Sequence, residues 1–287
     1  MTAMTRLVAA LVSLAAVAVH GEVRAAESYD NCTGFINSLP ATISTQGTWC
    51  LSKHLFTSMT SGAAITLATD NVTIDCNHFR LSGFGAGAAT DASGISAGAS
   101  RLNATVRRCR IQGFKYGVLL YGSGHLVEDN QFDGSTRTGI YVHGDAVVRD
   151  NFVTDTGGRP GDVYSYGIYA LGSGSGAQVL DNTIRGIAPV GDGGGNKGPV
   201  GIHLLNGMAQ GNRIGGLLPG GTFDAQGIVL VDATVARDNL LTQLTATTGV
   251  GIQGAGTGDS LCQDNTVQRY AVGIDSCQLA GSNGVQP

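Results

Sequence analysis

The chain has 287 residues, of which 42% are hydrophobic and 45 are glycine, and its formal net charge at pH 7 is −4. An acidic chain with only 17 Lys and Arg lacks the electrostatic surface that nucleic-acid binding requires, which excludes that function class. An anionic polymer could bind only through a local cluster of basic residues.

Residues 1–25 are predicted to be a secretory signal peptide. Arg6 supplies the positive n-region, residues 7–19 form the apolar run, and residues 23–25 form a small-residue site that predicts cleavage after Ala25 or nearby. The apolar run is shorter than the roughly 20 residues of a membrane-spanning helix. No later segment could span a membrane as a helix, so we expect an exported protein, either periplasmic or extracellular.

The six cysteines are consistent with an oxidising compartment. Fifteen pairings are possible in principle, and the order along the chain favours one set: Cys32 with Cys50, Cys76 with Cys109, and Cys262 with Cys277. The middle pair falls at nearly the same position of two adjacent repeats, as bridging requires. Metal binding is the rival interpretation, but the sequence contains no Cys-x-x-Cys and no nearby pair of histidines.

Two short phrases alternate along the chain and form an internal repeat. One is Gly followed by Ile or Val and an alternating strand pattern; these glycines are Gly94, Gly117, Gly139, Gly167, Gly201, Gly227, Gly251 and Gly273. The other is an apolar run ending in Asp-Asn, as in LVEDNQF (126–132) and QVLDNTI (178–184). The glycine spacing has a minimum near 22 residues with variable excess, and the apolar pattern has period 2. This pattern predicts strands stacked coil on coil rather than helical repeats.

The asparagines of the second phrase fall at one position of the repeat. They are Asn77, Asn130, Asn151, Asn182, Asn212, Asn239 and Asn265, with Cys109 in the second coil's place. Stacked amides can hydrogen-bond from coil to coil, and Asn tolerates the left-handed backbone of a sharp turn. A structural role is therefore preferred for them over a catalytic one, while the preceding Asp is expected to point outward or to cap the turn.

With these phrases, residues from about 65 to 276 resemble the right-handed parallel β-helix family, which includes pectate lyases and polygalacturonases. The resemblance implies an all-β fold: a right-handed parallel β-helix (β-solenoid) of about eight coils at residues 65–287. It also implies an N-terminal cap within residues 26–64. The Gly-Ile strand would form the first sheet of each coil, the strand ending in Asp-Asn the second, and the strand after Asn the third. In this family the substrate groove usually runs along the first sheet.

The alternation after each glycine predicts which residues of the first sheet face outward. Two outward columns bring together Tyr121, Tyr141, His143, Tyr169 and His203 on four successive coils. At a spacing of about 4.8 Å per coil, they span roughly 14 Å, the scale of a short oligosaccharide. Exposed Tyr also has high β-propensity, and a lone exposed His is usually solvated surface, so each residue has a structural alternative.

The two longest insertions, residues 155–166 and 187–200, precede Gly strands and are predicted to be loops beside this face. They would contribute the substrate-binding candidates Arg159, Asp162, Tyr164, Tyr166, Asp192 and Lys197, together with Tyr121. Aromatic faces can stack on sugar rings, and cations can bind uronate carboxylates. A Gly-rich connection without a binding role is the alternative for residues 191–198.

Three functions fit the sequence. A polysaccharide lyase would use His143, His203, Tyr141 or Tyr169 as base or acid, and Arg159, Lys197 or Ca²⁺ as charge neutraliser. The sequence does not identify metal ligands, and it lacks the complete motifs of polygalacturonases and pectate lyases. A non-catalytic glycan-binding solenoid would use the same aromatic residues without an acid–base pair. A structural or adhesive solenoid would need no site, although it would not need the two long insertions either.

Overall fold

The computed structural model describes residues 31–190, 196–221, 224–256 and 259–286, so the predicted signal peptide at residues 1–25 lies outside the described residues. The chain divides into two units, Met1–Asp30 and Asn31–Pro287. The described part of the second unit is built of strands, with one short 3-10 helix, η1 (Phe84–Ala86). Among the described residues, no helix has the length and apolar character needed to cross a membrane.

The strands of this unit form three parallel ladders, called sheets 1, 2 and 3 in the order in which each coil visits them. Sheet 1 contains β2 (Ala41–Ile43), β5 (Ala63–Leu67), β8 (Ser93–Ala97), β11 (Tyr116–Leu120), β14 (Thr138–His143), β17 (Tyr164–Leu171) and parts of β20 (Asn196–Gln210), β23 (Ala225–Arg237), β24 (Leu240–Ala255) and β26 (Thr266–Asp275). Sheet 2 contains β1 (Gly34–Ile36), β3 (Gly47–Leu51), β6 (Val72–Asp75), β9 (Thr105–Arg107), β12 (Leu126–Glu128), β15 (Val147–Arg149), β18 (Ala177–Leu180), the later parts of β20 and β23, β25 (Leu261–Gln263) and β27 (Gln278–Ala280).

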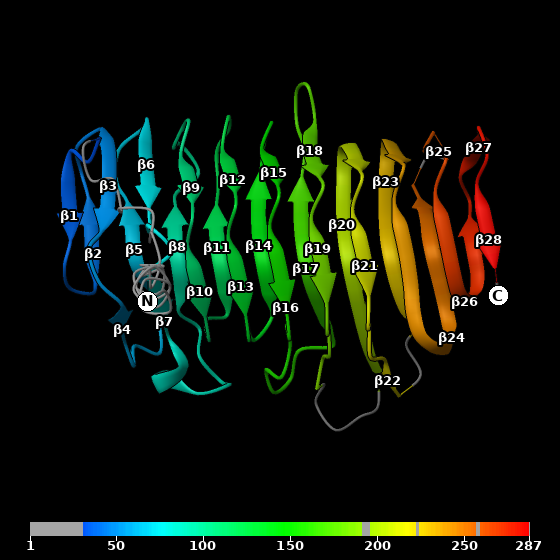
Figure 1. Cartoon of the computed structure of the whole chain (residues 1–287), viewed down its shortest axis with the longest axis horizontal. Helices are drawn as coiled ribbons and strands as arrows, with labels where there is room; N and C mark the ends of the chain where they lie inside the picture. The colour runs from blue at the N-terminus through cyan, green and yellow to red at the C-terminus, as the bar shows by residue number, and fades with distance from the viewer. Residues whose placement is uncertain (1–30, 191–195, 222–223, 257–258, 287) are drawn as a thin grey trace, which may run out of the picture. The chain divides into compact units, whose positions relative to one another are not determined.

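Sheet 3 contains β4 (Leu55–Phe56), β7 (Arg80–Ser82), β10 (Arg110–Gln112), β13 (Gln131–Asp133), β16 (Phe152–Thr154), β19 (Thr183–Arg185), β21 (Arg213–Gly215), the first parts of β24 and β26, and β28 (Gly284–Gln286). The short β22 (Gly220–Gly221) pairs antiparallel with the start of β20. Figure 1 shows the strands following one another from β1 to β28 in chain order, as coils of a solenoid.

The parallel β-helix predicted from the sequence is confirmed. Each of the eight Gly-Ile phrases lies in a strand of sheet 1, from β8 to β26. Sheet 1 also has two earlier strands, β2 and β5, that lack the glycine, and β5 pairs in register with β8. Residues 34–56 supply β1 to β4, which pair in parallel with the next coil.

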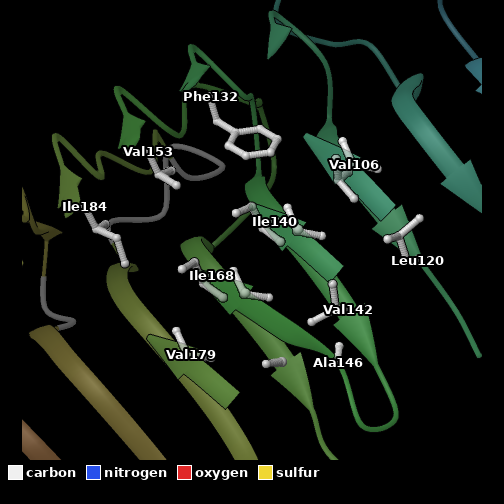
Figure 2. Close-up of a cluster of buried hydrophobic side chains, with 14 of the residues drawn as sticks. Val106, Leu120, Phe132, Ile140, Val142, Ala146, Val153, Ile168, Val179 and Ile184 are labelled. Carbon is white, nitrogen blue, oxygen red and sulfur yellow. The ribbon is translucent and has the colours of Figure 1, made fainter. Parts of the chain in front are cut away.

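The interior of the solenoid is filled by apolar columns that run along it. The Ile or Val after each glycine is fully buried except Ile274 of the last phrase, which is partly buried, and these residues occupy matched positions of sheet 1. Figure 2 shows Ile140 and Ile168 of this column beside Phe132, Val153 and Ile184. The three sheets therefore share one hydrophobic core, since each inward side chain packs on its counterparts in the neighbouring coils.

The glycine of each phrase is required by packing with sheet 3. A Cβ on Gly117 would lie 2.5 Å from Cδ1 of Phe132, and a Cβ on Gly139 would lie 2.6 Å from Cγ1 of Val153. Both Cβ atoms would also lie within 2.8 Å of the carbonyl oxygen of the next glycine in the column. The Cα hydrogens of these glycines therefore face the core. Because the following Ile or Val is also buried, the alternation breaks at each glycine.

We expect Gly139→Ala to destabilise the protein by about 1–3 kcal/mol, since the new methyl group overlaps both a core side chain and a backbone oxygen. The matched control is Gly98→Ala, because a Cβ there meets no atom within 4 Å. Urea unfolding of both variants measures the difference. Equal stabilities of Gly139→Ala and Gly98→Ala would contradict the packing explanation.

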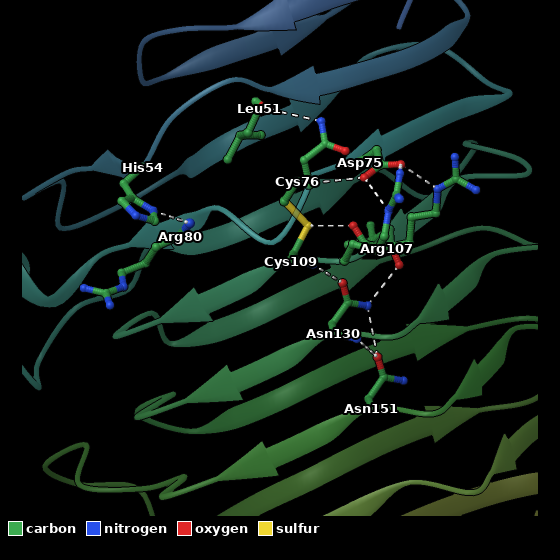
Figure 3. The surroundings of a disulfide bond; sticks show 12 residues. Leu51, His54, Asp75, Cys76, Arg80, Arg107, Cys109, Asn130 and Asn151 are labelled. Atoms are coloured by element: carbon green, nitrogen blue, oxygen red, sulfur yellow. Dashed lines mark hydrogen bonds and ion pairs between the residues drawn. A yellow bond between two sulfur atoms is a disulfide. The ribbon is translucent and has the colours of Figure 1, made fainter. Parts of the chain in front are cut away.

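The predicted asparagine stack is present and extends to one further residue. The backbone N–H of Asn151 donates to Oδ1 of Asn182 at 3.0 Å, and the N–H of Asn182 donates to Oδ1 of Asn212 at 3.0 Å. The same bond recurs between the later members and ends at Asn283. Figure 3 shows the start of the stack, where the N–H of Cys109 donates to Oδ1 of Asn130. These side chains are buried structural elements.

The left-handed residue of the turn is the Asp of the Asp-Asn pair, whereas the sequence interpretation assigned that conformation to the Asn. Asp150 has φ 56° and Asp181 has φ 54°, and both residues are exposed. The Asp conformation turns the backbone so that the next residue points inward, where its amide reaches the neighbouring coil. Asp tolerates this region better than most residues.

All three predicted disulfides are present: Cys32–Cys50, Cys76–Cys109 and Cys262–Cys277. The second joins successive coils at the position of the asparagine stack, as Figure 3 shows. Beside it, the buried carboxylate of Asp75 accepts hydrogen bonds from Arg107 and Arg108. Although burial opposes ionisation, these bonds together hold the pKa of Asp75 below its ordinary value.

Candidate functional site

Sheet 1 presents a continuous cluster of aromatic side chains on its outer surface, here called the aromatic face. Its members are Tyr116, Tyr121, Tyr141, His143, Tyr164, Tyr166, Tyr169 and His203. Tyr121 directly follows β11, and the others lie on four consecutive strands, β11, β14, β17 and β20. Of the tyrosines that the structure describes, only Tyr270, buried in the core, lies elsewhere.

The two outward columns predicted from the sequence are in register. Tyr141 is the partner of Tyr169, which is the partner of His203, and the ring of Tyr121 lies 4.6 Å from the ring of His143. The five residues expected on four successive coils are therefore brought together. β-strand pairing is responsible, since it places matched positions about one rung apart.

Tyr141, Tyr169 and His203 form a stack along the solenoid axis. The Tyr141 and Tyr169 ring centroids are 5.0 Å apart with planes tilted by 10°, and those of Tyr169 and His203 are 4.5 Å apart with an 11° tilt. Tyr169 thus has a neighbouring ring on each face. It can offer a ligand its edge and hydroxyl group but not its face, so a sugar ring cannot stack on this residue.

Tyr164 and Tyr166 belong to β17, and the expectation that they lie on a loop is wrong. Likewise Lys197 lies in β20, although its side chain is outside the described part, and Asp192 falls outside the described residues altogether. The ring of Tyr166 contacts those of Tyr169 at 4.8 Å and His203 at 6.0 Å. Because of the alternating Tyr-Ser-Tyr pattern, β17 begins at Tyr164, within the insertion that was expected to form a loop up to residue 166.

Tyr116 is a member of the aromatic face that the sequence interpretation missed. Its ring lies 5.7 Å from that of Tyr141. It directly precedes Gly117, where strict alternation would turn it inward. Because both Gly117 and Val118 face the core, the residue before the glycine is returned to the outer surface. The repeated Gly-Ile pair was the signal that could have revealed this shift.

A chain of charged side chains, here called the charged rim, lies where the strands β8, β11, β14 and β17 begin. Its members are Asp91, Lys115, Arg137, Arg159 and Asp162. Lys115 Nζ is 2.6 Å and Arg159 Nη2 3.0 Å from the Asp91 carboxylate. The hydrogen bond from Lys115, with the nearby charge of Arg159, holds the pKa of Asp91 below its ordinary value.

Arg159, predicted as a substrate-binding cation, is engaged within this rim. Nη1 donates to the carbonyl oxygens of Ala89 and Thr90 at 2.9 and 2.6 Å, and Nε lies 3.4 Å from Asp162. It therefore ties the 155–163 segment to the segment before β8.

Arg137 is the more accessible cation of the rim and was not singled out from the sequence. Its Nη1 donates to the hydroxyl of Tyr116 at 3.1 Å, and its distance to Asp162 is 3.7 Å. Arg137 links the rim to the aromatic face, and the rim as a whole carries one more positive than negative charge.

Burial sets the protonation of the aromatic face. Desolvation lowers the pKa of His143 and His203, and it raises the pKa of Tyr141 and of Tyr166 to about 12. The histidines are therefore neutral and the tyrosines protonated near neutral pH. On β14 the Tyr141 hydroxyl lies 3.3 Å from Nε2 of His143. Nδ1 of His203 is buried without a hydrogen-bond partner among the described residues.

Acid should destabilise the protein in part through His203. Its folded pKa lies below the ordinary 6.5, so the unfolded chain takes up the proton first as pH falls through 6.5. The free energy of unfolding should therefore decrease from 6.5 down to the lowered pKa. Urea unfolding at several pH values should show that the free energy of unfolding decreases less with falling pH in His203→Gln than in the unaltered protein. The decrease that remains should come from His125 and His143, whose pKa values are also lowered. An unchanged pH dependence in His203→Gln would contradict this assignment.

The described residues contain no group of three or more His, Cys, Asp or Glu side chains placed to hold a metal ion. Calcium requires several oxygen ligands, and the carboxylates of the rim, Asp91 and Asp162, are paired with basic side chains. The described part of the site does not fit a calcium ion.

Comparison with known proteins identifies the fold. The family model described as the right-handed beta helix region matches residues 41–184 and 93–284. The Dettilon tailspike protein superimposes with a TM-score of 0.58 at 11% identity, covering 87% of this chain and 51% of the tailspike. A PL6 family polysaccharide lyase from Pseudopedobacter saltans superimposes with a TM-score of 0.50 at 14% identity, covering 89% of this chain and 80% of the lyase. The chain thus spans about half the length of the tailspike. No curated protein matches the sequence.

Proposed function

The chain belongs to the right-handed β-helix family, and from that premise we propose that it binds a polysaccharide along the aromatic face of sheet 1. The observation that carries the proposal is the concentration of six tyrosines and two histidines on four consecutive coils, in a continuous series of ring contacts. These side chains are half-buried on the outer surface, and an aromatic cluster of this kind is typical of a binding surface, since a structural spacer does not require one.

The chemistry of the face suits sugars. Because the middle of the stack offers ring edges, hydroxyl groups rather than ring faces make the central contacts. Protonated Tyr141 and Tyr166 can donate to sugar oxygens, and the neutral histidines can accept from sugar hydroxyls. Four rungs span about 14 Å, which fits a short oligosaccharide segment.

The charged rim favours an acidic polysaccharide. Arg137 is only weakly engaged by Asp162, at 3.7 Å, and stands beside the aromatic ring of Tyr116. A uronate carboxylate could replace that long contact with a two-point hydrogen bond to the guanidinium. The P. saltans lyase, by its name, acts on polysaccharides, which supports a polysaccharide ligand for a similar fold without specifying its charge.

Lytic cleavage is the second candidate function, favoured by the Tyr141–His143 pair. A lyase needs a base to remove the proton next to the uronate carboxylate and an acid to protonate the leaving oxygen. A neutral imidazole and a protonated phenol stand 3.3 Å apart on β14, and Arg137 could neutralise the carboxylate. Without the cleavage step, the same residues would serve binding alone.

A screen of the mature protein against acidic and neutral polysaccharides tests the proposal. Retardation in affinity electrophoresis measures binding, and the ultraviolet absorbance of unsaturated uronates measures lytic cleavage, each with and without Ca²⁺. We expect retardation by an acidic polysaccharide. An absorbance rise that His143→Ala abolishes while binding persists would establish the lyase. Absence of binding to every polysaccharide would contradict the proposal and favour a structural or adhesive solenoid.

Export is part of the same proposal. The signal-like sequence at residues 1–25 and the three disulfides support an oxidising location, in a periplasm or outside the cell, where polysaccharides are accessible.

A further inference from the structure

Sheet 3 carries an unusual set of charges on its outer surface. Four arginines, Arg80, Arg110, Arg185 and Arg213, occupy its two outward columns, where Asp133 is the acidic residue among the described ones. Arg110, Arg185 and Arg213 are exposed. The four arginines are here called the basic stripe, and they belong to a protein whose net charge is −4.

These four arginines have no ion pair among the described residues, in contrast to most arginines elsewhere; the exceptions, Arg237 and Arg269, donate to the Gln210 side chain and to backbone carbonyl oxygens. Arg107 and Arg108 pair with Asp75, Arg149 with Glu128, and the rim arginines with Asp162. Asp133 accepts a hydrogen bond from Gln112 at 2.9 Å.

Arg80 and Arg110 are also direct partners on adjacent strands, about 4.8 Å apart along the solenoid. Like charges in this position repel each other. Nε of Arg80 is buried without a hydrogen-bond partner, and Figure 3 shows the side chain of Arg80 extending away from His54. The two guanidinium groups therefore stand close together without a carboxylate partner among the described residues.

Two adjoining cavities lie along this part of sheet 3 and share Arg80 and Gln112. The larger, of about 810 Å³, is lined by Phe56 and Phe84 among others. The smaller, of about 220 Å³, is lined by Arg110, Gln131 and Phe152 among others. Phe56, Phe84 and Phe152 are 64%, 54% and 41% exposed. Cations, amides and exposed aromatic rings thus lie together along five rungs, from β4 to β16, with Asp133 as the acidic residue that lines the smaller cavity.

We propose that this surface, called the sheet 3 groove and comprising the two cavities, is a second binding site for a carboxylate-bearing polysaccharide. Arginine binds carboxylates through paired hydrogen bonds, phenylalanine faces stack on sugar rings, and glutamine amides bond to hydroxyl groups. Arg80 and Arg110 stand on adjacent rungs of the groove, so two carboxylates of one polysaccharide chain can bind the two arginines. The acidic protein as a whole disfavours nucleic acid, whose charge density is far higher.

The test uses the mature protein with an oligogalacturonate as the probe, in a Tyr169→Ala background that weakens binding by the aromatic face. Calorimetric titration should show Arg80→Gln/Arg110→Gln binding at least about tenfold more weakly than the background protein, because two charge-assisted contacts are lost. Added salt should weaken binding less in this variant. The single variant Arg110→Gln, at an exposed position, should show a smaller loss. The charge-matched control is Arg149→Gln/Arg237→Gln on sheet 2.

Unchanged affinity in both sheet 3 variants, or equal loss in the sheet 2 control, would overturn the proposal. So would equal binding of a carboxyl-reduced oligosaccharide, or tighter binding of a single-stranded oligonucleotide of the same length. Failure of the aromatic-face proposal is a separate result, since it would appear as unaltered affinity when Tyr169→Ala is introduced into the otherwise unchanged protein.

Discussion

Replacing Asn182 with alanine should lower the free energy of unfolding by roughly 3–5 kcal/mol, because several buried polar groups lose their partners at once. Oδ1 of Asn182 accepts from both the backbone N–H and Nδ2 of Asn151. Its Nδ2 donates to the carbonyl oxygen of Val148 at 2.9 Å. In Asn182→Ala the N–H groups of Asn151 and the carbonyl group of Val148 remain buried, so water cannot replace the lost hydrogen bonds.

The matched control is Gln178→Ala, four residues earlier on β18, where the side chain is exposed. A surface substitution of this kind should change stability by less than about 0.5 kcal/mol. Urea unfolding compares the two variants. If Asn182→Ala were no less stable than Gln178→Ala, the asparagine stack would be incidental to the fold rather than one of its main supports.

Replacing Tyr169 should produce the largest loss of polysaccharide binding. Tyr169 is the central ring of the stack, in contact with Tyr141, Tyr166 and His203. Tyr169→Ala removes its contact area and leaves its neighbours unsupported, so affinity for an acidic oligosaccharide should fall by roughly 30-fold or more.

Tyr169→Phe separates the two contributions of this residue. It keeps the stack and removes the hydroxyl, and since the ring face is covered, affinity should still fall by about fivefold. Val272→Ala, on the same sheet but beyond the aromatic face, should bind as the unaltered protein does. Full affinity in Tyr169→Ala would place the binding site elsewhere.

The fold could be predicted from the sequence because the constraint at each repeat is local. The Gly strand and the buried Asn recur once per coil, and register follows from them, which is why Tyr141, Tyr169 and His203 were correctly aligned. The Cys76–Cys109 pair followed from the same alignment, whereas the other two pairs were predicted from the order of the cysteines along the chain.

The details of the candidate site were less predictable because they depend on packing between coils. Alternation could not place Tyr116, since the inward glycine reflects contact with Phe132 of sheet 3. Nor could sequence show that Arg159 is bound to carbonyl groups about 70 positions earlier while Arg137 stays accessible. Arg80 and Arg110 of sheet 3 are about 30 residues apart in the sequence, and they become neighbours only because β7 pairs with β10.

The most direct test of polysaccharide binding by the aromatic face is an NMR titration of the mature protein with selectively labelled tyrosine rings. Six of the described tyrosines lie on the aromatic face, while Tyr270 is buried in the core and serves as an internal reference. Adding an acidic oligosaccharide should shift the ring signals of the six and leave that of Tyr270 unchanged. Saturable binding without any shift of the six signals would contradict the account.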